Sequence, residues 1–285
     1  MRTGLRTDRD FTRVHGLLTD LDLHTVCQSA KCPNRHECWN NGTATMMILG
    51  DTCTRRCRFC AVVKGSPVGV DVDEPDRVAA AAKEMGLRYV VLTSVTRDDL
   101  PDGGAGIFAE SIRAVQREIP GAGVEVLVPD FKGSQESLRS VLEAGPHVFA
   151  HNLETVRRLQ PVVRPQASYE RSLSVLRFAA DFRPHVVVKS GLMLGMGESD
   201  EEVLQALDDL VKTGCELLTL GQYLAPSAEH HPVARFITPD EFEDVAARAR
   251  LIGFKGVASA PRVRSSYKAA ELFEVARREA ACPGY

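Results

Sequence analysis

The chain has 285 residues, a formal net charge of −3 at pH 7 and 44% apolar residues, which is the composition of a globular protein with a substantial core. No apolar run approaches the roughly 18 residues of a membrane span, and the charged first residues lack the apolar segment of a secretory signal. The near-neutral charge balance argues against nonspecific binding to nucleic acid. We therefore expect a cytoplasmic protein without membrane or nucleic-acid partners.

From about residue 45 the sequence alternates short β-branched runs with amphipathic stretches, which predicts alternating strands and helices. The expected strands cover residues 46–51, 89–95, 124–129, 148–153, 186–194 and 217–224, with 256–260 as a late strand candidate. The expected helices cover residues 75–85, 106–118, 134–143, 169–181, 200–213 and 239–252. Ser199 with Glu202, and Thr238 with Pro239, are typical of helix starts.

Nearly continuous apolar strands separated by helices indicate right-handed βαβ units and a parallel sheet. A curved partial barrel and an open doubly wound sheet would show the same periodicity. Six strand and helix units suit the barrel, so we expect an α/β fold with a partial (β/α)6 TIM-type barrel over residues 46–260. Residues 1–45 and 261–285 would form extensions of this barrel. In either architecture the site lies at the carboxyl ends of the strands.

Eight cysteines are distributed unevenly, with six of them between residues 27 and 60. Clustered thiols in a chain without an export signal indicate metal or redox chemistry rather than disulfides. Cys215 and Cys282 stand apart from this cluster, and we expect them to have packing or surface roles.

Cys53, Cys57 and Cys60 directly follow the first expected strand, in the sequence GDTCTRRCRFCA. A loop of this spacing can bind a four-iron cluster through three thiolates and leave the fourth iron without a protein ligand. The alternative is structural zinc, which takes four ligands, and no convincing fourth ligand lies nearby in the sequence. The pattern therefore favours an iron–sulfur cluster with an open iron, where chemistry can take place.

A second triplet, Cys27, Cys32 and Cys38, precedes the first expected strand. It also leaves one position of a four-iron cluster without a cysteine. His36 is close in sequence, although a loop histidine is more commonly solvated or hydrogen-bonded than a ligand.

The cysteine loop resembles the signature of radical S-adenosylmethionine enzymes, and the chain resembles the lipoyl synthase family over nearly its whole length. The resemblance rests on HTVCQSAKCPNRHECW, GDTCTRRCRFCAVVKG, TSVTRDDLPDGGA, HNLETV, KSGLMLGMGE, LGQYLAPS and PRVRSSYKA. It implies that Cys53, Cys57 and Cys60 hold a [4Fe-4S] cluster whose free iron takes the amine and carboxylate of S-adenosyl-L-methionine. It also implies that Cys27, Cys32 and Cys38 hold an auxiliary [4Fe-4S] cluster that donates sulfur.

The same resemblance implies that a serine of the RSSY motif is the fourth ligand of the auxiliary cluster, so that both extensions would hold it. We favour Ser266 and keep Ser265 as the alternative. A hydroxyl is a harder donor than a thiol and loses its proton less readily, so it is a weak ligand that suits a cluster consumed in catalysis. In an arbitrary protein, such a serine pair would more commonly make a turn or a cap.

The resemblance also implies contacts to S-adenosyl-L-methionine from polar groups around the strand ends. The expected cofactor-binding residues are Phe59, Ser94, Asn152, Glu154 and Lys189. Phe59 would pack near the adenine, and ordinary core packing is compatible with this role. We assign no residue to general acid–base catalysis.

The activity that the resemblance implies is that of a sulfurtransferase. It is the radical-mediated insertion of two sulfur atoms, at C6 and C8, into the octanoyl chain of lipoyl-carrier proteins, with two S-adenosyl-L-methionine molecules used per product. The implied partners are octanoylated lipoyl domains of 2-oxoacid dehydrogenase E2 subunits, octanoylated glycine cleavage H protein, reduced ferredoxin or flavodoxin, and an iron–sulfur carrier protein.

Basic residues between Cys27 and Lys64 would stabilise thiolate charge or meet an acidic carrier, and a solvated basic surface is the alternative. They are Lys31, Arg35, Arg55, Arg56, Arg58 and Lys64.

Two other functions remain open at this point. A biotin-synthase-like or methylthiolating radical enzyme would share the Cys53–Cys60 loop but not the first triplet or RSSY, and a zinc-binding interaction module would need no cofactor.

Overall fold

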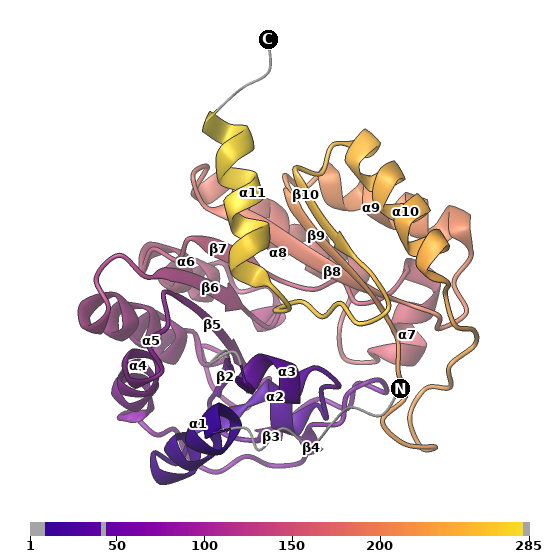
Figure 1. The fold of residues 1–285 in the computed structure, drawn as a ribbon. Helices are drawn as coiled ribbons and strands as arrows, with labels where there is room; N and C mark the ends of the chain where they lie inside the picture. The colour runs from indigo at the N-terminus through magenta and orange to yellow at the C-terminus, as the bar shows by residue number, and fades with distance from the viewer. Residues whose placement is uncertain (1–8, 41–43, 282–285) are drawn as a thin grey trace.

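The computed structural model describes residues 9–40 and 44–281, so Cys282 lies outside the described residues. An eight-stranded sheet with the order β1-β2-β5-β6-β7-β8-β9-β10 organises the protein (Figure 1). Its strands are β1 (His24–Thr25), β2 (Thr45–Ile48), β5 (Tyr89–Ser94), β6 (Gly123–Leu127), β7 (Val148–Ala150), β8 (Val187–Leu194), β9 (Leu217–Gln222) and β10 (Gly256–Ser259).

From β2 to β10 every neighbouring pair is parallel, and the spatial order follows the chain order. A doubly wound sheet would reverse its order at a switch point, whereas a sheet wound in one direction places all its crossover helices on one face. The partial barrel is therefore confirmed and the doubly wound alternative is wrong. The late strand candidate is β10, which adds a parallel strand at the edge of the sheet.

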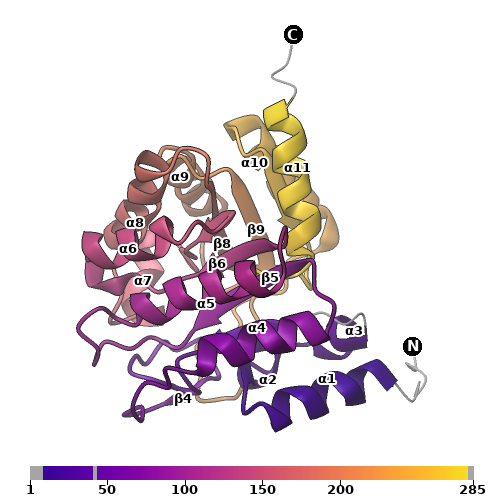
Figure 2. The same cartoon turned by 90° about the vertical axis from the view of Figure 1, so that its left-hand side faces the viewer.

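The crossover helices cover the outer face of the sheet, where α4 packs on α5, α5 on α6 and α6 on α8 (Figure 2). They are α4 (Glu74–Glu84), α5 (Ala105–Glu118), α6 (Gln135–Glu143), α8 (Tyr169–Phe182), α9 (Asp200–Val211) and α10 (Pro239–Ile252). Capping boxes start α9 at Ser199 and α10 at Thr238. Short elements complete the rim: β3 (Thr52–Cys53), β4 (Val63–Lys64), η1 (Phe131–Gly133), η2 (Arg157–Leu159) and α7 (Gln160–Val163).

The N-terminal segment forms α1 (Arg9–Asp20), β1, α2 (Val26–Ser29) and α3 (Arg35–Asn40). β1 pairs antiparallel with β2, so this segment extends the barrel sheet. A clasp joins it to the C-terminal extension: Asn34 Nδ2 donates to the Arg262 carbonyl at 2.7 Å, and Arg262 Nε donates to Asn34 Oδ1 at 3.1 Å. Tyr267 adds a hydrogen bond to Glu37 at 2.9 Å. The N-terminal segment and the C-terminal extension therefore meet beside the first cysteine triplet.

The last helix, α11 (Ala269–Ala281), lies across the amino ends of the strands, opposite the cysteine loop. Its Phe273 ring lies 5.7 Å from the ring of Tyr89 and 6.0 Å from that of His147. Leu272 packs with Leu217 at the start of β9. This helix closes one end of the barrel and leaves the other end for the site. No helix among the described residues is long and apolar enough to span a membrane.

A buried ion pair lies inside the barrel toward this closed end. Lys189 Nζ lies 2.6 Å from Glu125 Oε1, and both side chains are 1% exposed. Tyr89 donates a hydrogen bond to the other Glu125 oxygen at 2.8 Å. Burial, together with the Glu125 charge, raises the pKa of Tyr89, so its hydroxyl stays protonated and donates. Each member of the network is therefore satisfied inside the protein.

Lys189→Met would leave the Glu125 carboxylate buried without a cation. Because removing one partner of a buried pair is costly, we expect the free energy of unfolding of the metal-free protein to fall by about 3–5 kcal/mol in urea titrations. The matched double variant, Lys189→Met with Glu125→Gln, keeps an acceptor for Tyr89 and should regain most of that loss. A single variant as stable as the wild type would contradict the burial of this pair.

Candidate functional site

A cavity of about 560 Å³ opens at the carboxyl ends of the strands. Both cysteine triplets line it, together with strand-end residues and the segment 263–267. The single winding direction of the sheet explains this convergence, because it brings the carboxyl ends of the parallel strands to the same rim. The cavity therefore joins the N-terminal extension, the barrel and the C-terminal extension.

Cys53 ends β3, and Cys57 and Cys60 follow in the loop. The Cys53 thiol accepts hydrogen bonds from the backbone N–H of Arg55 at 3.4 Å and of Thr96 at 3.3 Å. Burial, together with the charges of the nearby Cys57 and Cys53, raises the pKa of Cys60 to about 12. The three thiols therefore lie close enough to interact electrostatically, and metal binding must displace their protons.

The first triplet faces the same cavity. Cys27 is buried in α2, and burial raises its pKa. Burial, followed by the charges of Cys27 and Cys32, raises the pKa of Cys38 to about 11. In the described part of the chain, no three His, Cys, Asp or Glu side chains are grouped as ligands of a single metal ion. His36 does not line the cavity, and its ring packs 5.5 Å from that of Phe11.

The two RSSY serines make different contacts. Ser266 Oγ accepts a hydrogen bond from Thr45 Oγ1 at 2.8 Å, and the Thr45 backbone in turn hydrogen-bonds the Cys27 thiol. Ser265 Oγ accepts a hydrogen bond from Asn152 Nδ2 at 3.0 Å. Ser266 is thus next to the first triplet, whereas Ser265 is tied to the end of β7.

Three buried polar atoms on the cavity-lining residues Ser94, Asn152 and Arg164 have no hydrogen-bond partner among the described residues. They are Ser94 Oγ, Asn152 Oδ1 and Arg164 Nε. A buried polar atom without a partner costs about 1–3 kcal/mol, so their convergence indicates a polar ligand. A molecule with an amine and a carboxylate, bound beside thiolate-held iron, fits these atoms and the thiol donor set.

Arg164 is a site residue that the sequence reasoning missed. Its guanidinium donates to the carbonyls of Asn152 at 3.2 Å and Leu153 at 3.1 Å, and its charge lowers the pKa of Cys57, which burial raises. Asn152 Nδ2 also donates to Glu154 Oε1 at 3.2 Å. Burial raises the pKa of Glu154, while Arg164 and Asn152 lower it in part. Nothing in the local sequence marks Arg164, because only the fold brings it to the rim.

Four of the five expected cofactor contacts, namely Phe59, Ser94, Asn152 and Glu154, line the cavity. Lys189 does not, because it is the third residue of the eight-residue strand β8 and lies toward the closed end. Its amine is also held by Glu125. The expectation that Lys189 contacts the cofactor therefore needs correction: it belongs to the internal ion pair.

A parallel partial barrel with three cysteines after its first parallel strand defines the class of radical S-adenosylmethionine enzymes. The sequence matches the Radical SAM superfamily over residues 47–210. Solved structures support the fold: methylornithine synthase superimposes with a TM-score of 0.57 at 17% identity, covering 74% of this chain and 62% of its own. Coproporphyrinogen III oxidase from Escherichia coli does so with a TM-score of 0.54 at 14% identity, covering 81% and 56%.

Curated relatives narrow this class. Lipoyl synthase from Rubrobacter xylanophilus is 54% identical over 270 residues, covering 95% of this chain and 84% of its own. Lipoyl synthase from Pyrobaculum arsenaticum is 55% identical over 280 residues, covering 97% and 94%. The chain belongs to the lipoyl synthase family. It is a radical sulfurtransferase that uses [4Fe-4S] and S-adenosyl-L-methionine chemistry.

Gly221 seats the RSSY segment on β9, because a Cβ at this position would lie 2.1 Å from the Val263 carbonyl oxygen. Gly221→Ala should displace residues 262–267 and lower stability by about 1–3 kcal/mol. Hydrogen–deuterium exchange should then show faster exchange in this segment. Gly69→Ala adds its Cβ to open space and serves as the matched control. Equal exchange in the two variants would contradict this close approach.

Proposed function

We propose that the protein inserts two sulfur atoms, at C6 and C8, into the octanoyl chain of octanoylated lipoyl-carrier proteins. Two S-adenosyl-L-methionine molecules are used per product, and the sulfur comes from an auxiliary [4Fe-4S] cluster. The observation that carries this proposal is that both cysteine triplets line one cavity. An alkyl chain in this cavity reaches a hydrogen-abstracting site and a sulfur-donating site without leaving the protein.

Cys53, Cys57 and Cys60 hold the cofactor-cleaving cluster in this proposal. When bound and reduced, the cluster and S-adenosyl-L-methionine supply a 5′-deoxyadenosyl radical. Arg164 and Ser94 meet the carboxylate and amine of the methionine part, which would satisfy two of the unpartnered buried atoms. Asn152 and Glu154 contact the ribose, and Phe59 packs near the adenine.

Cys27, Cys32 and Cys38 hold the auxiliary cluster, which is consumed as a substrate. Ser266 is the proposed fourth ligand, and the support for it over Ser265 is its hydrogen bond to Thr45, which itself contacts Cys27. Ser265 is occupied by Asn152 on the cofactor side of the cavity. Residues 27–38 of the N-terminal extension and 263–267 of the C-terminal extension would thus serve the auxiliary cluster, while the barrel strands and the loop with Cys53 would serve the radical cofactor.

The wall of the cavity between the triplets suits an eight-carbon chain. Met47, Leu127 and Met193 contribute apolar surface from three different strands. Apolar walls bind the octanoyl group and exclude water from a reactive carbon radical. The contribution of the protein is therefore mainly to position the chain and to exclude solvent.

The proposed partners are octanoylated lipoyl domains of 2-oxoacid dehydrogenase E2 subunits and the glycine cleavage H protein. Lys31 and Lys64 line the cavity and are exposed, which suits an acidic carrier surface. Reduced ferredoxin or flavodoxin supplies electrons, and an iron–sulfur carrier protein rebuilds the auxiliary cluster. A cytoplasmic location accords with seven free cysteines among the described residues.

The central test is anaerobic reconstitution with iron and sulfide. The protein is then incubated with S-adenosyl-L-methionine, dithionite and an octanoyl-lysine peptide of a lipoyl domain, with products read by mass spectrometry. We expect two cofactor cleavages for each peptide that gains two sulfur atoms. Cys27→Ala should still cleave the cofactor but give no lipoyl product, whereas Cys53→Ala should lose both reactions. A lipoyl product from Cys27→Ala would overturn the assignment of the sulfur donor.

Arg164→Met tests the proposed carboxylate contact. Hydrogen bonds to charged groups contribute about 1.5–3 kcal/mol, so the Kd for S-adenosyl-L-methionine should rise roughly 10- to 150-fold in equilibrium dialysis. Arg158→Met is the matched control, since Arg158 lies in the same segment but is exposed and pairs with Glu202. A Kd for Arg164→Met equal to that of the control would rule out this contact.

The two serines should respond differently to replacement. Ser266→Ala should lower the iron content of the auxiliary cluster, and Ser266→Cys should restore the iron but slow sulfur transfer, because a thiolate holds iron more firmly. Ser265→Ala should keep the iron and weaken cofactor binding, because Asn152 loses its partner. Iron analysis beside cofactor binding separates them, and the reverse pattern would make Ser265 the ligand.

A further inference from the structure

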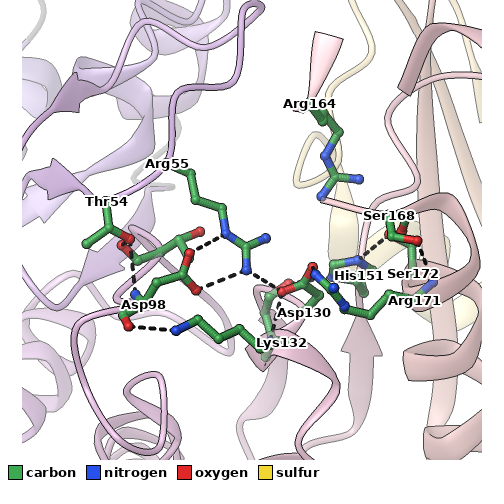
Figure 3. Close-up of polar contacts among 12 residues, drawn as sticks. Thr54, Arg55, Asp98, Asp130, Lys132, His151, Arg164, Ser168, Arg171 and Ser172 are labelled. Carbon is green, nitrogen blue, oxygen red and sulfur yellow. Dashed lines mark hydrogen bonds and ion pairs between the residues drawn. The ribbon is translucent and has the colours of Figure 1, made fainter. Parts of the chain in front are cut away.

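A buried charge network fastens the Cys53–Cys60 loop to the barrel (Figure 3). Arg55 lies between Cys53 and Cys57, and its side chain is 4% exposed. Its Nε and Nη2 donate to the two Asp98 oxygens at 2.7 and 3.0 Å. Nη2 also donates to Asp130 Oδ1 at 2.6 Å. One side chain of the loop thereby binds the segments that follow β5 and β6.

The backbone reinforces this attachment. The Thr54 N–H and hydroxyl both donate to the Thr96 carbonyl, at 3.0 and 2.9 Å. The Thr54 hydroxyl also accepts from the Asp98 N–H at 3.0 Å, and the Thr96 N–H reaches the Cys53 thiol. The two residues after Cys53 are therefore held to the rim by contacts with the segment after β5.

Asp130 anchors the far side of the network. Its carboxylate is fully buried, accepts from the Lys132 N–H at 3.0 Å and lies 3.3 Å from Arg171 Nη1. Burial raises the pKa of Asp130, but the hydrogen bond and charge of Arg55 lower it more, so it stays ionised. The ion pairs of the network thus join two cations, Arg55 and Arg171, to two anions, Asp98 and Asp130, and Lys132 Nζ adds a hydrogen bond to the Asp98 carbonyl at 2.9 Å.

Stability of the fold does not explain this arrangement, because buried ion pairs contribute little compared with an apolar replacement. The position of Arg55 beside the cysteine loop explains the network better. The Arg55 backbone N–H donates to the Cys53 thiol at 3.4 Å, and Arg55 lines the same cavity as the three thiols of its loop. Its Nη1 has no hydrogen-bond partner among the described residues, and the side chain lines the cavity. The reduction potential of an iron–sulfur cluster depends on nearby charge and hydrogen bonds.

We propose that Arg55, held by Asp98 and Asp130, is a positioning residue for the cofactor-cleaving cluster. It fixes the turn between Cys53 and Cys57 on the ends of β5 and β6, and its fixed positive charge beside the thiolates raises the reduction potential of the cluster. This inference rests on the proposed function, in which these cysteines hold the cluster.

Three full-length variants test the proposal. Arg55→Gln removes both the positive charge and the guanidinium that binds Asp98 and Asp130, whereas Arg55→Lys keeps the charge but not the guanidinium. Arg56→Gln removes a charge from the exposed neighbouring residue and is the matched control. In the metal-free protein, hydrogen–deuterium exchange of residues 52–60 should become at least tenfold faster for Arg55→Gln and Arg55→Lys. It should not change for Arg56→Gln.

In the reconstituted protein, a redox titration follows the electron paramagnetic resonance signal that S-adenosyl-L-methionine perturbs. We expect the equilibrium constant for reducing the cluster to be at least tenfold smaller in Arg55→Gln, which lowers the reduction potential by about 59 mV for one electron. The reduction potentials of Arg55→Lys and Arg56→Gln should stay close to that of the wild type. Exchange and potential in Arg55→Gln equal to those of Arg56→Gln would overturn the proposal. If Arg55→Gln retains no cluster, the Arg55→Lys variant decides. A reduction potential equal to that of the wild type, with faster exchange of residues 52–60, supports the proposal. A shifted reduction potential, or exchange as slow as in the wild type, refutes it. A wild-type protein without a cofactor-sensitive signal would instead refute the proposed function, while the metal-free exchange still tests the anchor.

Discussion

The site depends on the clasp between Asn34 and Arg262, where two segments 228 positions apart exchange hydrogen bonds. Cys27 and Cys38 lie on short helices that bury few side chains of their own, and Cys32 lies between these helices, so the segment needs an external support. The clasp supplies it and brings segment 263–267 to the rim of the cavity. Gly221 completes the arrangement, because its missing side chain admits the backbone at Val263.

The two ends of the barrel differ in whether their buried polar groups have hydrogen-bond partners. At the closed end, the Glu125 carboxylate has both a cation and a hydroxyl donor, and α11 seals it from solvent. At the open end, atoms of Ser94, Asn152 and Arg164 are buried and have no hydrogen-bond partner within the part of the chain that the structure describes. Because such atoms weaken the fold, the open end holds a local instability that a polar ligand relieves. A polar ligand bound at the rim would therefore stabilise the folded protein.

Periodicity and capping predicted the strands and helices of the barrel well, although periodicity alone did not distinguish the barrel from a doubly wound sheet. The six crossover helices and the parallel strands lie within a few residues of their expected positions, because each combines an apolar pattern with local start and stop signals. The helix α11 was missed, since residues 269–281 carry no capping signature and their role is to cover strand ends formed far earlier in the chain. Spacing alone identified both cysteine triplets, and the structure places them on a common cavity.

Single polar residues were harder to place from sequence. Lys189 stands in an apolar strand, and only the length and register of β8 show that it points away from the open end. Arg164 follows a short helix, and no local sequence pattern distinguishes it. The same is true of Asp98 and Asp130, the partners of Arg55, which lie 43 and 75 positions further along the chain. These side chains are defined by tertiary contacts, which periodicity does not encode.

The clasp also has a consequence for biosynthesis. Translation produces Cys27, Cys32 and Cys38 well before Arg262 and Ser266. The loop with Cys53 needs mainly strands that are complete well before then. With Ser266 as the proposed ligand, the strands beside the Cys53 loop are therefore made before the first triplet can gain its contacts from residues 262–267. A chain shortened before Arg262 would keep the Cys53 loop but would lack both the clasp and the proposed serine ligand.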